Sequence, residues 1–280
     1  MTLGLVAGLA AAALFGIAAV VQAHAVRRQD NRPEGLVPFV LISVRDPWTV
    51  GVVVAYLAGF VLHVVAIWEL PLYLAQATIA MSLPVTAVTS MLLHERLQPV
   101  HWWAVGLVSA GLVLLSVGSG EPGPRVTSAW FAVVLWLGVA ALLLASRVGL
   151  RWPGSTLAGL AGFGYAGSAI AVRGAEFPLD ATGVAAALSV GAYGVTAFWL
   201  YSVALDRVPV SAASAPLIVV QTFVPALIGV LLLGDGVREG WWPAIVAGLL
   251  LATIGAVVLS GDSITSPVTE APDPTRDQAS

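Results

Sequence analysis

The chain has 280 residues, of which 59% are hydrophobic and 10% are charged, and its formal net charge is -3. Soluble proteins carry about 25% charged residues, so this composition predicts a chain embedded in lipid, and the small net charge without an arginine cluster argues against a nucleic-acid partner. The sequence has no cysteine, which excludes disulfides, thiolate metal sites and thiol redox chemistry.

Nine stretches are nearly free of charge and have about the 20 residues that a membrane-spanning helix needs. Their leucine, alanine, valine and glycine content favours helices, because barrel strands would be shorter and would alternate polar with apolar residues. The sequence therefore predicts an all-α polytopic membrane protein. The predicted spans are Thr2–Val26, Thr49–Trp68, Pro71–Leu93, Pro99–Gly118, Ser128–Ser146, Gly154–Val172, Thr182–Leu205, Pro209–Leu233 and Trp241–Ser260.

Two segments near the N-terminus have alternative interpretations. Gly35–Val44 is too short to cross a bilayer and contains Pro38, so we interpret it as an interfacial or re-entrant piece; if it crosses, the count becomes ten. The first span resembles a signal peptide, but its basic residues, Arg27 and Arg28, follow the apolar stretch instead of preceding it. We therefore expect this span to remain in the protein.

The distribution of arginine predicts the orientation of the chain. Odd-numbered loops hold most of the arginines, and such loops face the cytoplasm. We therefore expect the N-terminus outside and the C-terminus inside the plasma membrane of a bacterium, with the polar tail 262–280 disordered and cytoplasmic. The odd loops hold Arg27, Arg28, Arg32, Arg45, Arg96, Arg147, Arg151 and Arg207, and the even loops hold Arg125, Arg173 and Arg238.

The two halves of the chain resemble each other. "VAGLA" at Val6–Ala10 matches "LAGLA" at Leu157–Ala161, and Pro71 at the second loop matches Pro209 at the seventh. Each of the first four predicted spans matches the span five places later, and an odd separation inserts the second half upside down. The sequence thus predicts two inverted-topology repeats, which are typical of transporters. Residues 1–118 form the first repeat, 119–150 the connecting span and 151–261 the second repeat.

The acidic residues lie at span ends or in loops. Glu95 and Asp235 end matching spans, and we interpret both as solvated acids beside helix starts, where the helix dipole favours negative charge. No set of acid, base and nucleophile meets at one depth, and no histidine pair has metal-ligand spacing. The sequence therefore predicts neither an enzyme, nor a metal site, nor a cofactor.

Three consecutive motifs resemble a known family. "SLPVTAV" (Ser82–Val88), "LLHERL" (Leu92–Leu97) and the glycine-spaced "GLVSAGLVLL" (Gly106–Leu115) are similar to the EamA-type repeat of the drug/metabolite transporter superfamily. The resemblance implies a secondary carrier of small metabolites, drugs or ions. Nine spans, with "RDPWTVG" (Arg45–Gly51) before the second, look closer to the branch of magnesium transporters. The small multidrug exporters of this superfamily use a glutamate in the first helix, but Gly8–Ala23 has no acid here.

Polar residues inside the spans are the candidates for a substrate pathway, since they are costly in lipid unless they face a partner or water. His63 is the strongest, because a titratable group at depth is typical of a pathway or proton relay. The alternative for each is a hydrogen bond between helices. The candidates are His63, Gln76, Tyr201, Gln221, Gln22 and Thr222, with Pro84 and Pro225 as helix breaks that could expose backbone.

These observations favour a secondary transporter that moves a small metabolite or drug-like solute by alternating access at a site between the repeats. The alternatives are a magnesium or other divalent-cation carrier and a membrane scaffold that does not transport. The expected partners are a small-molecule substrate and the lipid bilayer, and a homodimer remains an open alternative.

Overall fold

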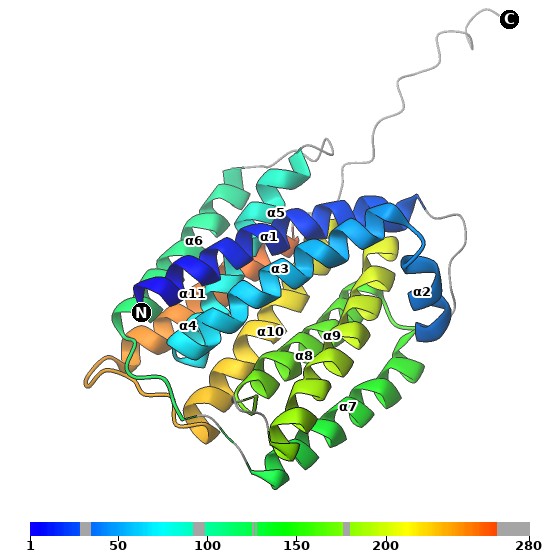
Figure 1. The fold of residues 1–280 in the computed structure, drawn as a ribbon. Helices are drawn as coiled ribbons and strands as arrows, with labels where there is room; N and C mark the ends of the chain where they lie inside the picture. Colours follow the sequence, from blue (N-terminus) through cyan, green and yellow to red (C-terminus); the bar gives the residue numbers. More distant parts are fainter. Residues whose placement is uncertain (29–34, 92–98, 125, 127, 176–179, 262–280) are drawn as a thin grey trace, which may run out of the picture.

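The computed structural model describes residues 1–28, 35–91, 99–124, 126, 128–175 and 180–261, which form a bundle of α-helices (Figure 1). The predicted tail 262–280 and the turn at Glu95 lie outside the described residues. The helices are α1 (Thr2–Arg27), α2 (Leu36–Ser43), α3 (Pro47–Glu69), α4 (Leu72–Ala80), α5 (Ser82–Ser90), α6 (Pro99–Val117), α7 (Ala129–Gly149), α8 (Gly154–Val172), α9 (Ala181–Arg207), α10 (Val210–Leu232) and α11 (Trp242–Gly261).

Most of these helices are suited to a bilayer. Among the described residues, seven helical segments are long and apolar enough to cross a membrane. Helices α6 and α11 add the shorter apolar stretches Trp102–Val117 and Trp242–Gly255. The protein is therefore an all-α, multi-pass membrane protein. The seven segments are Thr2–Val26, Pro47–Glu69, Leu72–Thr89, Ala129–Gly149, Gly154–Val172, Ala181–Arg207 and Ala212–Leu232.

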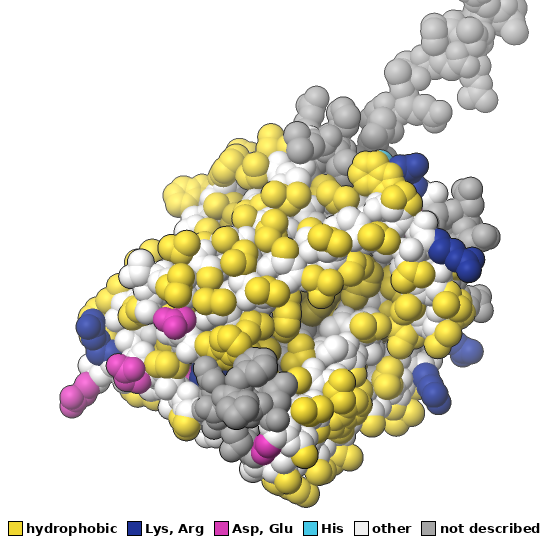
Figure 2. All heavy atoms as spheres, in the orientation of Figure 1, with side chains coloured by type: hydrophobic (Ala, Val, Ile, Leu, Met, Phe, Trp, Pro, Cys, Tyr) yellow, Lys and Arg dark blue, Asp and Glu magenta, His cyan; other side chains and the backbone are white. Residues whose placement is uncertain are grey.

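The surface agrees with a membrane position. Figure 2 shows a mainly apolar face between two ends where the charged side chains gather. Many tryptophans near helix ends are exposed, as expected at the boundary between lipid and water. The exposed tryptophans are Trp48, Trp102, Trp103, Trp130, Trp136, Trp152, Trp241 and Trp242.

The predicted third span is divided into two helices, α4 and α5, that meet at Met81. Pro84 has no N–H to donate to the carbonyl of Ala80, and its ring crowds that carbonyl. The Met81 N–H instead donates to the carbonyl of Thr78 at 3.1 Å, a tighter turn than the α-helical one. The interruption lies in the turn that precedes Pro84.

The break expected at Pro225 does not occur, because α10 runs without interruption through Pro216 and Pro225. Helix α10 packs against α8, α4 and α11. Contacts on several sides hold a helix together where a proline removes one backbone hydrogen bond. The matching prolines of the two halves therefore have different structural effects.

The short segment before the second span is the eight-residue helix α2. A helix of this length extends about 12 Å, less than half of the hydrocarbon core, so α2 does not cross the membrane. It lies beside α9, with the rings of Phe39 and Phe198 5.9 Å apart. Helix α2 therefore lies across one end of the bundle, at the right in Figure 1.

The long helices pack in recurring pairs: α1 on α3, α8 on α9, and α6 on α11. The amino group of Met1 lies 3.7 Å from Glu69, so α1 begins where α3 ends. The Arg173 side chain, just after α8, reaches the carbonyl of Leu70 at the same end. Helices α1 and α8 thus run in opposite directions.

Close packing of α6 on α11 depends on glycine at position 111. A Cβ atom there would lie 2.6 Å from the carbonyl oxygen of Gly248 and 2.9 Å from the nitrogen of Ala252, whereas a Cβ on Gly106 would meet nothing within 4 Å. We expect Gly111→Ala to lower the free energy of unfolding by about 1–3 kcal/mol, because backbone atoms must shift. Gly106→Ala should leave it unchanged or slightly raised. Unfolding in detergent measures both, and equal effects of the two variants would contradict this assignment.

Candidate functional site

A cavity of about 630 Å³ lies between helices of the two halves of the chain. Its walls come from α1, α3, α4 and α5 on one side and from α8, α9 and α10 on the other, and α2 lines one end. The volume is in the range of roughly 300–1,000 Å³ that is typical of small-molecule sites. The cavity can therefore hold one metabolite or drug-sized molecule.

Four of the six candidate side chains line this cavity: His63, Gln76, Tyr201 and Gln221. His63 comes from α3 and Gln76 from α4, and each is less than a tenth exposed. Their Nε2 atoms lie 3.1 Å apart. An amide nitrogen can only donate, so His63 Nε2, as placed, accepts from Gln76, which fits a neutral imidazole with its proton on Nδ1.

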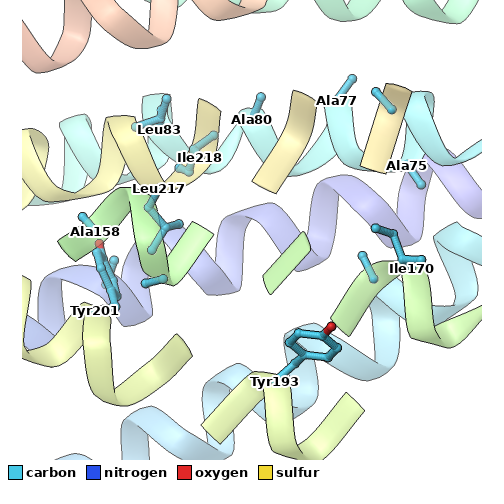
Figure 3. Close-up of a cluster of buried hydrophobic side chains, with 14 of the residues drawn as sticks. Ala75, Ala77, Ala80, Leu83, Ala158, Ile170, Tyr193, Tyr201, Leu217 and Ile218 are labelled. Carbon is cyan, nitrogen blue, oxygen red and sulfur yellow. The ribbon is translucent and has the colours of Figure 1, made fainter. Parts of the chain in front are cut away.

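The second half contributes Tyr201 and Gln221 to the cavity lining. The hydroxyls of Tyr201 on α9 and Ser214 on α10 form a hydrogen bond of 2.6 Å, which joins the two helices. Figure 3 shows Tyr201 together with Leu217 and Ile218 of α10, which also line the cavity. Small residues on α4, such as Ala77, let α10 approach it closely.

Several polar atoms in the lining have no hydrogen-bond partner among the described residues. They are Nδ1 of His63, the hydroxyl of Ser43 and the hydroxyl of Tyr165. His63 and Ser43 are 6% and 7% exposed. A buried polar atom without a partner costs about 1–3 kcal/mol, so a ligand or water that bonds these atoms would bind favourably.

Three aromatic rings that contact one another form part of the lining. Phe15 of α1 stacks on Tyr56 of α3 at 5.6 Å, and Tyr56 meets Phe198 of α9 edge to face at 5.8 Å. Aromatic side chains offer large rigid apolar surfaces. None of the described lining residues is Asp, Glu, Lys or Arg, so the cavity is suited to a neutral, partly apolar molecule.

The other two candidates lie outside the cavity lining and connect helices. Gln22 on α1 donates to the hydroxyl of Ser202 on α9 at 2.7 Å. Thr222 on α10 donates to the backbone carbonyl of Gln76 at 3.5 Å. For these two residues, the structure favours the alternative given in the sequence analysis, a hydrogen bond between helices in place of a position in the substrate pathway.

A buried ion pair between Arg173 and Asp235 closes the bundle at the end opposite α2, and the sequence analysis missed it. The guanidinium lies 2.8 Å from the carboxylate, and the two residues are 2% and 5% exposed. The interpretation of Asp235 as a solvated acid is wrong, because backbone N–H groups of Leu72 and Gly123 also donate to it, at 2.6 and 2.7 Å. Arg173 further donates to the carbonyls of Gly123 and Leu70.

This Arg173–Asp235 cluster joins four segments of the chain at one end: the α3–α4 junction, the α6–α7 connection, the end of α8 and the α10–α11 loop. Nearby, the Tyr73 hydroxyl donates to the carbonyl of Gly236 at 3.0 Å. The only sequence signal was the presence of opposite charges in two even-numbered loops, which does not reveal that the loops meet.

No group of three His, Cys, Asp or Glu side chains that could hold a metal ion occurs in the part of the chain that the structure describes. Comparison of the chain with protein-family models, with curated proteins and with solved structures gives no match. None of these comparisons therefore indicates a ligand for the cavity.

Proposed function

We propose that this protein is a secondary transporter that moves a small metabolite or drug-like solute across the plasma membrane by alternating access. The observation that carries the proposal is the cavity between the two halves, lined by His63 and Gln76 from the first half and Tyr201 and Gln221 from the second. A site between two halves can face either side of the membrane when the halves rock against each other.

The packing supports inverted repeats. Helix α1 packs on α3, α4 and α5, and α8 packs on the matching helices α9 and α10. Helices α1 and α8 run in opposite directions, as inversion requires. Counting α4 and α5 as one span and adding α6 and α11 gives nine spans, with α7 as the connecting span between residues 1–118 and 151–261.

The closed end supports alternating access as well. The Arg173–Asp235 cluster fills the end of the bundle beyond His63 and Gln76. In a transporter, such a cluster would seal one side of the site and would separate when the site opens to that side. A membrane scaffold has no need of a partly polar cavity between the two halves.

The relation to the EamA-type repeat of the drug/metabolite transporter superfamily stays part of the proposal and rests on the sequence motifs. The magnesium alternative is not carried forward, since bound Mg²⁺ usually takes one or two carboxylates and none occurs in the described lining. A role as an enzyme is likewise not proposed, because among the described lining residues only His63 is suited to acid–base chemistry near neutral pH.

We also propose that the end with α2 faces the cytoplasm of a bacterium. Arg28, Arg45, Arg151 and Arg207 are exposed at the ends of helices on that side, and positively charged loops stay in the cytoplasm. With nine spans, the C-terminus lies on the same side. Alkaline phosphatase fused after residue 280 should therefore be inactive. An active C-terminal fusion would contradict the orientation.

Transport is tested in two steps with the purified protein. A thermal-shift screen against water-soluble metabolites and amphiphiles identifies molecules that stabilise the fold, since a ligand of the folded state raises its stability. Proteoliposomes loaded with an unlabelled hit should then take up the labelled molecule by exchange. Gln221→Leu should reduce exchange, whereas Leu115→Ile, in the core of α6 away from the cavity, should not. Stable binding without exchange in any proteoliposome preparation would contradict transport.

A further inference from the structure

The cavity has a rim that faces the membrane, between α3 and α9. In the described residues, α3 packs on α1, α4 and α8, and α9 packs mainly on α8, α7 and α1. Helices α3 and α9 meet through the rings of Tyr56 and Phe198, 5.8 Å apart, without packing along their lengths. Val54 and Leu57 on α3 and Val195 on α9 line the cavity and are also 60%, 59% and 48% exposed. The hollow between the two helices is visible in Figure 2.

The rim lies at the depth of the hydrocarbon core. Val54 is about 10 Å along α3 from Pro47, at the 1.5 Å rise of a helix, and α3 is long enough to cross the membrane. Exposed valine and leucine at this depth contact lipid tails. Helix α2 lies across one end of the cavity and the Arg173–Asp235 cluster fills the other. The side between α3 and α9 therefore connects the cavity with the bilayer.

The interior defines the chemistry of a molecule that would enter this way. The wall is mainly aliphatic and aromatic, so most of the ligand must be apolar. His63 Nδ1 and the Ser43 hydroxyl are buried without a partner among the described residues and call for hydrogen-bonding groups. A charged head group would lose its hydration without meeting an opposite charge in the described lining, which is costly.

We propose that the cavity binds a neutral amphiphile, with an apolar chain and a hydroxyl or amide head, that enters from the bilayer between α3 and α9. This proposal names the class of substrate for the proposed transporter. Binding of the amphiphile does not depend on the proposed function, and only its movement across the membrane rests on it. The head bonds to His63, Gln76 or Gln221, and the chain lies between the aromatic rings and the rim.

The test uses the full chain in nanodiscs of zwitterionic lipid, with 1-decanoylglycerol as the probe and native mass spectrometry to count bound molecules. Glycerol tests the head alone, and decanoate at pH 7.5 tests a charged head. Decanoylglycerol should bind once per chain and about tenfold more tightly than decanoate, and glycerol should not bind. Gln221→Leu should weaken binding of decanoylglycerol by a similar factor.

The rim is tested by the double variant Val54→Trp/Val195→Trp, which should fill the space beside the rim that the apolar chain occupies and so reduce binding about tenfold. The matched control is Leu137→Trp on α7, which is exposed to lipid and does not line the cavity; it should bind normally. If the tryptophan pair lowers the unfolding temperature of the protein measured without decanoylglycerol, the smaller substitutions Val54→Phe/Val195→Phe are used in its place. Unchanged binding in the well-folded rim variants, binding of glycerol alone, or no binding of decanoylglycerol would each overturn the proposal.

These outcomes are separate from the test of transport. Exchange of a water-soluble metabolite in proteoliposomes, without binding of decanoylglycerol, would contradict the proposal of an amphiphilic ligand and support the transport function. Binding of decanoylglycerol that the rim variants weaken, without exchange of any molecule, would contradict the transport function and support the membrane-facing binding site.

Discussion

Asp235→Asn is expected to lower the free energy of unfolding by about 3–5 kcal/mol, because it leaves a buried guanidinium without its counter-charge. Arg173 is 2% exposed and lies 2.8 Å from the carboxylate. The carboxylate also accepts backbone N–H groups from Leu72 and Gly123, so the variant weakens contacts between four segments at once. Chemical unfolding of the purified protein in detergent measures the loss.

Two further variants separate the ion pair from a general effect of charge. Glu239→Gln, in the same α10–α11 loop but exposed, should change the stability by less than about 0.5 kcal/mol. The double variant Arg173→Met/Asp235→Leu should recover part of the loss, since replacing a buried pair by apolar residues is often tolerated. Equal stability of Asp235→Asn and Glu239→Gln would show that the buried pair is not what holds this end together.

The fold class was predictable because hydrophobic length is a strong signal. Spans such as Gly154–Val172 and Thr2–Val26 coincide with helices α8 and α1 to within a residue. The interruption of the third span at Met81 was foreseen as a break at Pro84, but the continuous α10 was not. Proline interrupts one helix and not the other because the surrounding helices differ. The sequence alone does not show which helices pack around each proline.

The Arg173–Asp235 cluster could not be predicted for a related reason. Both residues follow long apolar helices in loops that hold other charges, such as Glu176 and Arg238, so the sequence favours solvated side chains at both positions. The two lie 62 positions apart, and their contact depends on how the α3–α4 junction and the α6–α7 connection fold against them. Only the packing of the bundle shows that these loops exclude water and make an ion pair necessary.

The candidate site was predictable in part. Polar residues at depth in lipid need a partner or a cavity, and this rule selected His63, Gln76, Tyr201 and Gln221, which line the cavity. The same rule selected Gln22, which instead bonds to Ser202. Serines and tyrosines of the lining, such as Ser43 and Tyr165, were missed because these residue types are common in membrane helices and carry no distinctive spacing.

His63→Leu is expected to weaken binding of the transported molecule by at least about tenfold, or about 1.4 kcal/mol, and to slow exchange in proteoliposomes to a similar degree. Leucine occupies a similar volume but removes both ring nitrogens, including Nδ1, which has no partner among the described residues. The ligand then buries a polar group opposite an apolar side chain, which is the costly case. The fold should lose about 1–3 kcal/mol, because the buried Gln76 amide loses its hydrogen bond to His63.

The matched control is Ser189→Ala on α9. Ser189 is fully buried and polar, but its hydroxyl donates to the carbonyl of Ala186 and it does not line the cavity. This variant should exchange substrate at the rate of the unchanged protein.

The proton-relay role of His63 stays a prediction, and it requires that exchange lose its dependence on pH between about 6 and 7 in His63→Leu. A neutral His63 that accepts from Gln76 throughout the cycle would instead leave the pH profile unchanged while binding weakens. If binding and exchange are unchanged in His63→Leu, and Ser189→Ala also exchanges at the normal rate, His63 is not part of the substrate site.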